Sequence, residues 1–489
     1  MDSDRFRAAA SAVNRFGLGA RPGDLAQVTD PPAWLLAQVQ QPLAGASEFA
    51  GLPTSLEYLR REGVVNRKRR ELRIKNRGVP EKTPGPGGKP VNPLAEIYRQ
   101  EFGADLRREA VARWRVAAGT DTPFAERLVR FWSNHFAVSV DKGPARLYAA
   151  PFEREAIRPH WNGRFIDLLL AVETHPAMLR YLDQAQSVGP DSMLARRADR
   201  RLARRARRAD QPPRQLGLNE NLAREIMELH TLGLDAHYSQ GDVTEFARAL
   251  TGWSTPFPGQ LERGDFDSAF LYRPAAHEPG TRTVLGRRYE DTGFDQARAI
   301  LADFALHPAT ARHLSLQLAR HLVADDPPPS LVDRLAAAYL RGGGYLPAVY
   351  AELIRAPESW DAKAVKFRTP QDYLVAGVRG GGISIGDSPQ PFEAWANRLG
   401  QPTFKPRSPA GFSDVAMDWI GADALWKRIQ TAEGLAVRVP RAGLDPHAFG
   451  RALLGPNLRG DTVTAMARAE APQQAIAIAF ASPEFQWRA

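Results

Sequence analysis

Cysteine and long apolar runs are both missing from this chain of 489 residues. Without cysteine there can be no disulfide, no thiolate metal site and no cysteine nucleophile. The compartment stays open, because cysteine-free periplasmic proteins also exist. No segment approaches the roughly 18 uncharged apolar residues of a membrane span, and charge ends apolar segments such as Phe165–Val172. The sequence therefore predicts a protein that does not cross a bilayer.

The first residues, Met1–Arg7, lack the cationic segment followed by an apolar segment that marks a secretory signal. We therefore expect a cytoplasmic protein, with a periplasmic location left open. The glycine-rich nucleotide and dinucleotide motifs, the His-Glu-x-x-His zinc motif and the Gly-x-Ser-x-Gly nucleophile motif are missing as well. Nucleotide-binding, zincin and α/β-hydrolase functions thus have no support.

The composition is that of a folded protein, with 43% hydrophobic and 25% charged residues. Helical periodicity runs through most of the chain, so the predicted fold class is mainly α, with a multi-helical, bundle-like architecture. The clearest break is a proline- and glycine-rich linker at 77–93. We expect an N-terminal helical part at 1–76, a central helical core at 94–292 with a basic insertion at 195–210, and a C-terminal helical part at 293–489 that can continue the core.

A small β excursion interrupts the helical pattern near 265–285. The stretches Asp265–Tyr272 and Arg282–Leu285 have strand-like composition and are separated by turn residues. We expect these two stretches to pair as a small hairpin beside the helices.

The segment Leu218–Gly233 gathers the most unusual set of polar residues in the chain. Its predicted helix, Glu220–Leu232, has Asn219 as its N-cap and Gly233 at the left-handed position after the last turn. At about 100° per residue, one helical face carries four polar residues, namely Asn221, Arg224, Glu225 and Glu228. The apolar stripe is separate and consists of Leu222, Ile226 and Leu229, with His230 on the same apolar side.

Three interpretations of this polar face stay open. The face can be solvated and stabilised by i,i+4 pairs such as Glu220 with Arg224. It can be a buried network in which Arg224 neutralises Glu225 or Glu228 and fixes packing. It can also be catalytic, with Glu225 and Glu228 as metal ligands or as general acid and base, because carboxylates three residues apart project toward a shared point.

A second helix, Pro123–Val138, places His135 on the same face as its aromatic residues. Most histidines in that position donate to a carbonyl or carboxylate and do nothing further. If this face meets the Leu218–Gly233 helix, His135 is the first histidine to test as a partner of Glu225 or Glu228. The predicted metal ligands are therefore Glu225, Glu228, His135 and His230, and the predicted cofactor is a divalent ion.

The net charge of +10 is concentrated in two runs. Arg60–Arg77 holds nine basic residues, and Arg196–Arg208 holds eight arginines at helical spacing. Such a cationic rod can bind a polyanion or an acidic partner, and a solvated insertion without a ligand is the alternative. The candidate anion-binding residues are Arg67, Lys68, Arg69, Arg70, Arg196, Arg197, Arg200, Arg201, Arg204, Arg205 and Arg208.

Several motifs in a fixed order resemble a bacterial family known as domain of unknown function 1800. The motifs include Phe131–Phe136, Ala156–Pro159, His175–Leu179, Leu218–Gly233 and Ala247–Trp253, and the resemblance continues to Gly400–Pro402 and Ser482–Gln486. This chain departs from the family's pattern at Glu278, where relatives tend to have aspartate, and at Gln317, where lysine is usual. The family implies no firmly assigned activity. It does imply a protein partner from an alkaline phosphatase and sulfatase-like family, domain of unknown function 1501.

Three functions follow as hypotheses. The favoured one is a partner or scaffold protein with a buried Asn221, Arg224 and Glu225 network and basic docking segments for an acidic macromolecule. The second is a metal-dependent, hydrolase-like enzyme that uses Glu225, Glu228 and His135, in which the ion lowers the pKa of bound water. The third is a polyanion or nucleic-acid binder that acts through the arginine-rich segments.

Overall fold

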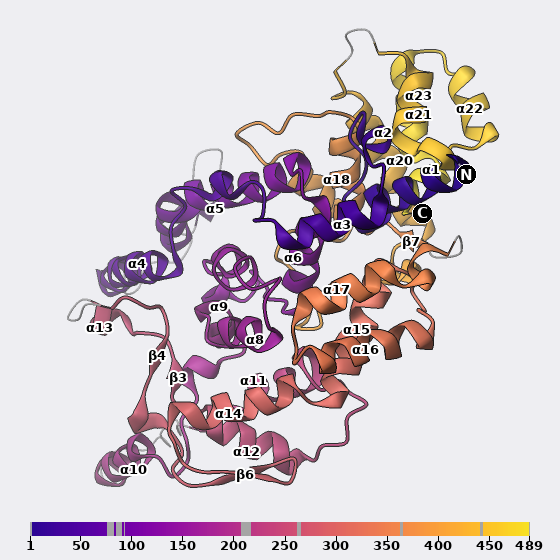
Figure 1. Cartoon of the computed structure of the whole chain (residues 1–489). Coiled ribbons are helices and arrows are strands. Elements are labelled where there is room, and N and C mark those ends of the chain that lie inside the picture. Colours follow the sequence, from indigo (N-terminus) through magenta and orange to yellow (C-terminus); the bar gives the residue numbers. More distant parts are fainter. Residues whose placement is uncertain are drawn as a thin grey trace.

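The computed structural model of the chain describes residues 2–75, 83–84, 90–91, 93–206, 217–261, 266–361, 365–440 and 444–488. Helices dominate these residues, and the strands are only two or three residues long (Figure 1). The predicted mainly α fold class is therefore confirmed. Among the described residues, no helix combines the length and the apolar character needed to span a bilayer.

The N-terminal part of the chain ends in the helices α5 and α6, which both contribute side chains to a pocket. The 27-residue α5 is roughly 40 Å long at 1.5 Å per residue. Proline starts several helices here, as in α3, where Asp30 Oδ1 accepts a hydrogen bond from the N–H of Ala33 at 3.1 Å. The elements are α1 (Asp2–Ser11), η1 (Ala12–Phe16), α2 (Asp24–Gln27), α3 (Pro31–Gln40), η2 (Ala46–Phe49), α4 (Ser55–Lys75), α5 (Pro93–Gly119) and α6 (Pro123–His135).

The same N-terminal cap, a histidine followed by proline, begins two helices in the middle of the chain. In both His-Pro-Ala tripeptides the histidine is the N-cap and proline begins the helix, with His175 Nδ1 and His307 Nδ1 each accepting from a backbone N–H at 3.1 Å. The helices are η4 (Gly143–Ala145), α7 (Ala149–Phe152), η5 (Glu153–Ile157), α8 (Phe165–Glu173), α9 (Pro176–Tyr181), η6 (Gln184–Gln186), α10 (Met193–Ala206), α11 (Asn221–Glu225), η7 (Ile226–His230), α12 (Gln240–Leu250), α13 (Pro258–Leu261), η8 (Pro274–Ala276), α14 (Phe294–Ala305), α15 (Pro308–Leu322), α16 (Pro329–Arg341) and α17 (Leu346–Arg355).

The C-terminal helices lie beside α1 and α2 at one end of the molecule, whereas α10 and α12 lie at the other (Figure 1). They are η9 (Pro357–Trp360), α18 (Pro370–Gly380), α19 (Phe392–Arg398), η10 (Ala416–Asp418), α20 (Ala422–Ala436), α21 (Pro446–Leu454), η11 (Gly455–Asn457), α22 (Gly460–Ala467), α23 (Pro472–Ala481) and α24 (Pro483–Gln486).

The strands form short antiparallel pairs. They are β1 (Thr83–Pro84) with β2 (Pro90–Val91), β3 (Trp253–Ser254) with β4 (Leu271–Tyr272), β5 (Arg282–Val284) with β6 (Arg287–Tyr289), and β7 (Lys366–Phe367) with β8 (Trp487–Arg488). The predicted pairing of 265–272 with 282–285 is wrong. Leu285 and Gly286, at φ +50° and +74°, form a tight turn that pairs β5 with the residues directly after it.

Two apolar cores lie under these elements. The larger contains buried residues from Ala9 to Ala356, and the smaller combines buried residues between 373 and 485 with Leu18, Trp114 and Ala117. Helix α6 packs into the larger core and α18 into the smaller one, so these two helices meet at the junction of the cores. The division of the chain at 292–293 stays a prediction.

Candidate functional site

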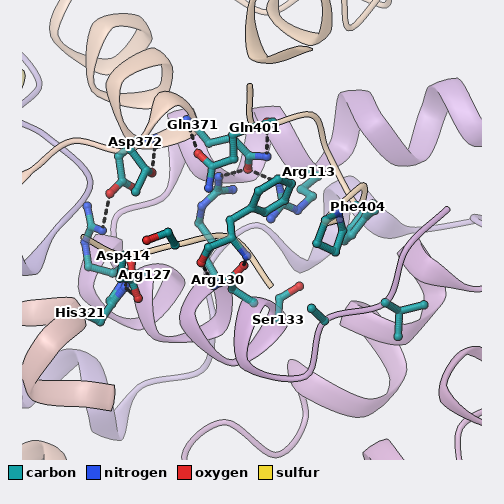
Figure 2. A pocket seen from close by; sticks show the side chains of 17 residues that line it. Arg113, Arg127, Arg130, Ser133, His321, Gln371, Asp372, Gln401, Phe404 and Asp414 are labelled. Atoms are coloured by element: carbon teal, nitrogen blue, oxygen red, sulfur yellow. Dashed lines mark hydrogen bonds and ion pairs between the residues drawn. The ribbon is translucent and has the colours of Figure 1, made fainter. Parts of the chain in front are cut away.

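A pocket of about 70 Å³ lies between α6 and α18, and side chains from α5, α15 and the segment at 401–414 complete it (Figure 2). One water molecule needs only about 10–15 Å³ of such space, so a group of several heavy atoms fits. Junctions between packed units are common positions for ligand sites. The charged, imidazole and amide side chains that line it are Arg113, Arg127, Arg130, Asn134, His321, Gln371, Asp372, Gln401 and Asp414.

Helix α6 carries the cationic wall of this pocket because its two faces differ. One face anchors the helix in the larger core through fully buried residues that include Phe124, Leu128 and Trp132. The other face presents Arg127, Arg130 and Asn134, which recur at helical spacing and all line the pocket. The apolar pattern of α6 therefore decides which of its polar residues meet the pocket.

Two arginines share one neutral oxygen at the centre of the pocket. The Oε1 atom of Gln371 accepts hydrogen bonds from Arg130 Nη2 at 2.8 Å and from Arg113 Nη1 at 3.1 Å. The amide of Gln371 is fixed in turn, because its Nε2 donates to the backbone oxygen of Gln401 at 3.0 Å. Arg113 also donates to Glu153 at 2.9 Å. The side-chain amide of Gln371 thus holds two guanidinium groups together without neutralising either.

Arg130 is the less compensated of the two cations. Burial, and then the neighbouring Arg113, lower its pKa to about 10. Within the described ranges, no carboxylate lies within ion-pair distance of Arg130, whereas Arg113 pairs with Glu153. An anion in the pocket can supply the missing negative charge.

Asp372 is the main counter-charge on the opposite wall. It lies in the first turn of α18, after the N-cap Thr369, and it pairs with Arg127 at 3.0 Å and with Arg488 at 3.4 Å. Burial alone raises the pKa of a carboxyl group, but Arg127 and Arg488 outweigh burial and hold the pKa of Asp372 well below its usual range. Asp372 is therefore ionised, and its charge is already used by these two arginines.

A histidine and an aspartate pair at one end of the pocket, near Arg127 (Figure 2). His321 Nδ1 lies 2.9 Å and 3.0 Å from the two carboxylate oxygens of Asp414. Burial lowers the pKa of His321 despite the opposing effect of Asp414, and the pKa of Asp414 is itself lowered because His321 outweighs burial. In the neutral ring, Nδ1 carries the proton and donates a hydrogen bond to the carboxylate of Asp414. The lone pair of the ring is then on Nε2.

Two buried atoms of the lining residues have no hydrogen-bond partner in the described part of the chain. They are His321 Nε2 and Arg127 Nη2. His321 is 8% exposed and Arg127 is 1% exposed, so bulk water does not satisfy these atoms. Because buried polar groups are nearly always hydrogen-bonded, these two atoms are candidates for hydrogen bonds to a bound ligand or water molecule.

Further buried arginines lie directly beyond Asp372. Arg368 Nε donates to the backbone oxygen of Phe485 at 2.8 Å, and Arg428 Nη2 donates to that of Arg368 at 2.7 Å. Burial lowers the pKa of Arg368 to about 9 and that of Arg428 to about 10. These arginines bind neutral oxygens, so they add positive potential to this side of the pocket.

A second pocket of about 290 Å³ adjoins the first and shares Asn134 and the segment at 412–414 with it. His135 Nε2 lies 3.2 Å from the backbone oxygen of His230, and His313 Nε2 lies 3.0 Å from that of Leu229. Both oxygens belong to the π-helical turn η7, a rare form that often marks functional regions. Burial lowers the pKa of His135 well below its ordinary value, with His313 and His230 acting in the same direction.

The Leu218–Gly233 segment forms α11 and η7, and Gly233 adopts the predicted left-handed conformation at φ +85°. Arg224 lies between Glu228 at 3.4 Å and Glu220 at 3.5 Å, and it donates to Gln240 at 2.7 Å. The Arg224 side chain is 37% exposed and that of Glu228 is 24% exposed. The network is thus half-exposed, because α12 covers only one side of it. The favoured hypothesis from the sequence was a buried network.

The structure brings only some of the other predicted site residues together: the rings of His135 and His230 lie 6.3 Å apart between centroids. Burial raises the pKa of Glu225, which is half-buried, and Asn221 is exposed. His230 is fully buried and its Nδ1 lies 2.8 Å from Glu173, so its predicted place on the apolar side is confirmed. In the described ranges, no hydrogen bond or ion pair joins His135 to Glu225 or Glu228.

No group of three or more His, Asp or Glu side chains in the described residues is arranged to hold a metal ion. The metal ligands that the sequence predicted, namely Glu225, Glu228, His135 and His230, therefore stay a prediction without geometric support.

The described parts of both basic runs lie on helices, α4 and α10, and helical spacing in the sequence indicated this for the second run. Arg67, Lys68 and Arg70 are exposed on α4, and Arg69 is half-buried. Arg196, Arg197 and Arg200 are exposed on α10. The side chains of Arg201, Arg204 and Arg205, and the whole of Arg208, fall outside the described residues.

The structure is that of a mainly helical protein with a partly buried pocket lined by several arginines. Residues 11–487 match the family described as protein of unknown function DUF1800, which is nearly the whole chain. The chain therefore belongs to this family, as its motifs predicted. It matches no curated protein and no solved structure.

Most of the residues that line the pocket were not predicted from the sequence, although the spacing of three of them on one helix was visible. The polar stripe of Arg127, Arg130 and Asn134 lies on the same helix as His135, and its spacing alone places the three residues together. Gln371, Asp372 and Asp414 carry no local pattern of this kind. Only the packing of distant segments brings them to α6.

Proposed function

We propose that the protein binds a small ligand with an oxyanion group in the pocket between α6 and α18. The observation that carries this proposal is the shared acceptor: Arg113 and Arg130 both donate to the neutral Oε1 of Gln371. Two guanidinium groups at one point are costly without an anion, and planar arginine forks suit phosphate, sulfate and carboxylate groups. The unpartnered Nη2 of Arg127 is a further donor available at the same pocket.

Isothermal titration calorimetry with inorganic phosphate, sulfate and acetate tests this proposal. We expect saturable binding of at least one of these anions. Arg130→Met should weaken it about 10- to 150-fold, because a hydrogen bond to a charged group contributes roughly 1.5–3 kcal/mol. The matched control is Arg312→Met, which removes an exposed arginine of α15 paired with Asp333. Absence of binding to all three anions, or equal binding by Arg130→Met and the wild type, contradicts the proposal.

A second function, docking of an acidic macromolecule, is supported by the exposed arginines of α10 at positions 196, 197 and 200. A labelled single-stranded oligonucleotide serves as the polyanion probe. If these arginines bind it, its dissociation constant rises steeply with salt, because cations that neutralise phosphates release counterions. An affinity that does not change between dilute and physiological salt contradicts this function. The scaffold role and the partner from the alkaline phosphatase and sulfatase-like family rest on the sequence and the family resemblance alone.

A further inference from the structure

We propose that the pocket hydrolyses phosphate monoesters, with His321 as the general base and Asp414 as the residue that positions it. This inference rests on the proposed function, because it takes the bound oxyanion to be the phosphoryl group of a substrate. The anion-binding proposal assigns only binding to this pocket, whereas hydrolysis is a reaction of the bound group.

The charge of the pocket favours a doubly charged group over a singly charged one. Three arginines, Arg113, Arg127 and Arg130, line it. Arg113 pairs with Glu153, and Asp414 pairs with His321. Arg127 and Arg488 share the single charge of Asp372, so Arg130 and one charge of the Arg127 and Arg488 pair are left for a ligand. A phosphate monoester is a dianion near neutral pH and offers several oxygens to these donors, whereas a carboxylate or a sulfate ester carries a single charge.

The histidine is held in the form that a general base requires. With Nδ1 donating to Asp414 at 2.9 Å, the lone pair of His321 is on Nε2. This atom is buried and unpartnered in the described part of the chain, and its residue lines the pocket. His230 Nε2 and His277 Nε2 are also buried without a partner in the described residues, and His321 differs from both because it lines the pocket.

The aspartate is fixed by the backbone around it. The backbone oxygen of Asp414 accepts from Lys366 Nζ at 2.6 Å, and the N–H of Ala416 donates to Asp325 at 2.7 Å. Gly411, at φ +78°, lets the same segment pass so close to Asn134 that a Cβ there would lie 2.4 Å from its backbone oxygen. Asp414 therefore holds the ring of His321 in one orientation, as the carboxylate of a catalytic triad does.

In the proposed step, a water molecule loses a proton to Nε2 of His321 as its oxygen forms a bond to phosphorus. The bond between phosphorus and the ester oxygen breaks, and the leaving oxygen takes its electron pair and then a proton from solvent. The products are an alcohol and inorganic phosphate, and the imidazolium returns its proton to solvent. Arg113 and Arg130 stabilise the charge on the phosphoryl oxygens.

The test compares orthovanadate, which mimics the five-coordinate transition state, with inorganic phosphate, both by calorimetry on the full chain. Analogues of this kind bind catalytic sites about 100-fold or more tighter than ground-state ligands. We expect a preference of that size in the wild type. His321→Gln and Asp414→Asn should lose most of the preference while they bind phosphate as the wild type does, a pattern that a merely structural role does not produce. The control His237→Gln, at an exposed histidine, should keep it.

The outcomes separate the two proposals. If neither phosphate nor vanadate binds, the anion-binding function fails, and hydrolysis fails with it. If phosphate binds and vanadate binds no more tightly in the wild type, only the hydrolysis is overturned, and this result does not depend on whether a variant folds. Binding of sulfate without binding of phosphate also overturns it, because the substrate of the proposed reaction carries a phosphoryl group.

Discussion

Two clusters of charged side chains in the described part of the chain differ in how their charges are compensated, one around Arg224 on α11 and one around Arg130 on α6. On α11, Arg224 lies between Glu220 and Glu228 and has a further acceptor in Gln240. On α6, Arg130 donates to the neutral oxygen of Gln371, which it shares with Arg113, and it has no ion-pair partner among the residues that the structure describes. The first group is half-exposed and balanced, whereas the second is buried and carries excess positive charge. A polar cluster thus points to a ligand when its charges are left uncompensated.

The largest effect that separates the two groups is expected at Asp372. Asp372→Asn removes the carboxylate that pairs with Arg127 and Arg488 and leaves both cations buried. Breaking a buried pair in this way costs about 3–5 kcal/mol of unfolding free energy. Urea denaturation measures it, with Asp333→Asn at an exposed ion pair as the control. If Asp372→Asn lowers the unfolding free energy no more than Asp333→Asn does, Asp372 is not the buried counter-charge of Arg127 and Arg488.

An intermediate effect is expected from pH at His135. Its folded-state pKa lies below the ordinary value of 6.5, chiefly through burial, so the unfolded chain binds the proton more readily than the folded one. The stability from the neutral ring is complete above pH 6.5 and falls on acidification below it, by up to about 1.4 kcal/mol per pH unit.

His135→Gln should therefore flatten the loss of stability between pH 6.5 and 5. Denaturation midpoints across this range give the slope, and His237→Gln, at an exposed histidine, is the control. Equal slopes for His135→Gln and the wild type show that His135 does not contribute to acid sensitivity.

The smallest effect is expected on α11. Glu228→Gln removes one of two carboxylates that flank the half-exposed Arg224. Solvent-screened pairs of this kind contribute about 0.2–1 kcal/mol, and Glu220 remains as a partner. Urea denaturation should show a change within that range. If Glu228→Gln destabilises the protein as much as Asp372→Asn, the contrast between the two regions is wrong.

The fold was largely predictable, because local rules decide most of its helices. Proline at the first turn and helical periodicity predict a helix at Pro123–Val138, and the structure has α6 at Pro123–His135. The pairing of β3 with β4 and of β5 with β6 was not predictable in the same way, because the turn at Leu285 and Gly286 joins β5 to the residues directly after it and not to β4. The spacing of apolar residues also does not predict single turns of π-helix such as η7.

The site was much less predictable, because its residues come from five distant segments. Gln371 and Gln401 bring Arg113 and Arg130 together, and Asp414 reaches His321 across 93 positions of the chain. None of these contacts follows from a local period. The Leu218–Gly233 motif was visible because its residues are close in sequence. Two of its carboxylates, Glu220 and Glu228, already pair with Arg224.

The most direct test of the central claim is the shift that phosphate causes in the unfolding free energy of three proteins: the wild type, Arg130→Met and Glu228→Gln. Phosphate at 100 times its dissociation constant should stabilise the wild type and Glu228→Gln by about 2.7 kcal/mol. At the same concentration, Arg130→Met should gain much less. If Arg130→Met keeps the full shift, or Glu228→Gln loses it, the ligand site is not the pocket between α6 and α18.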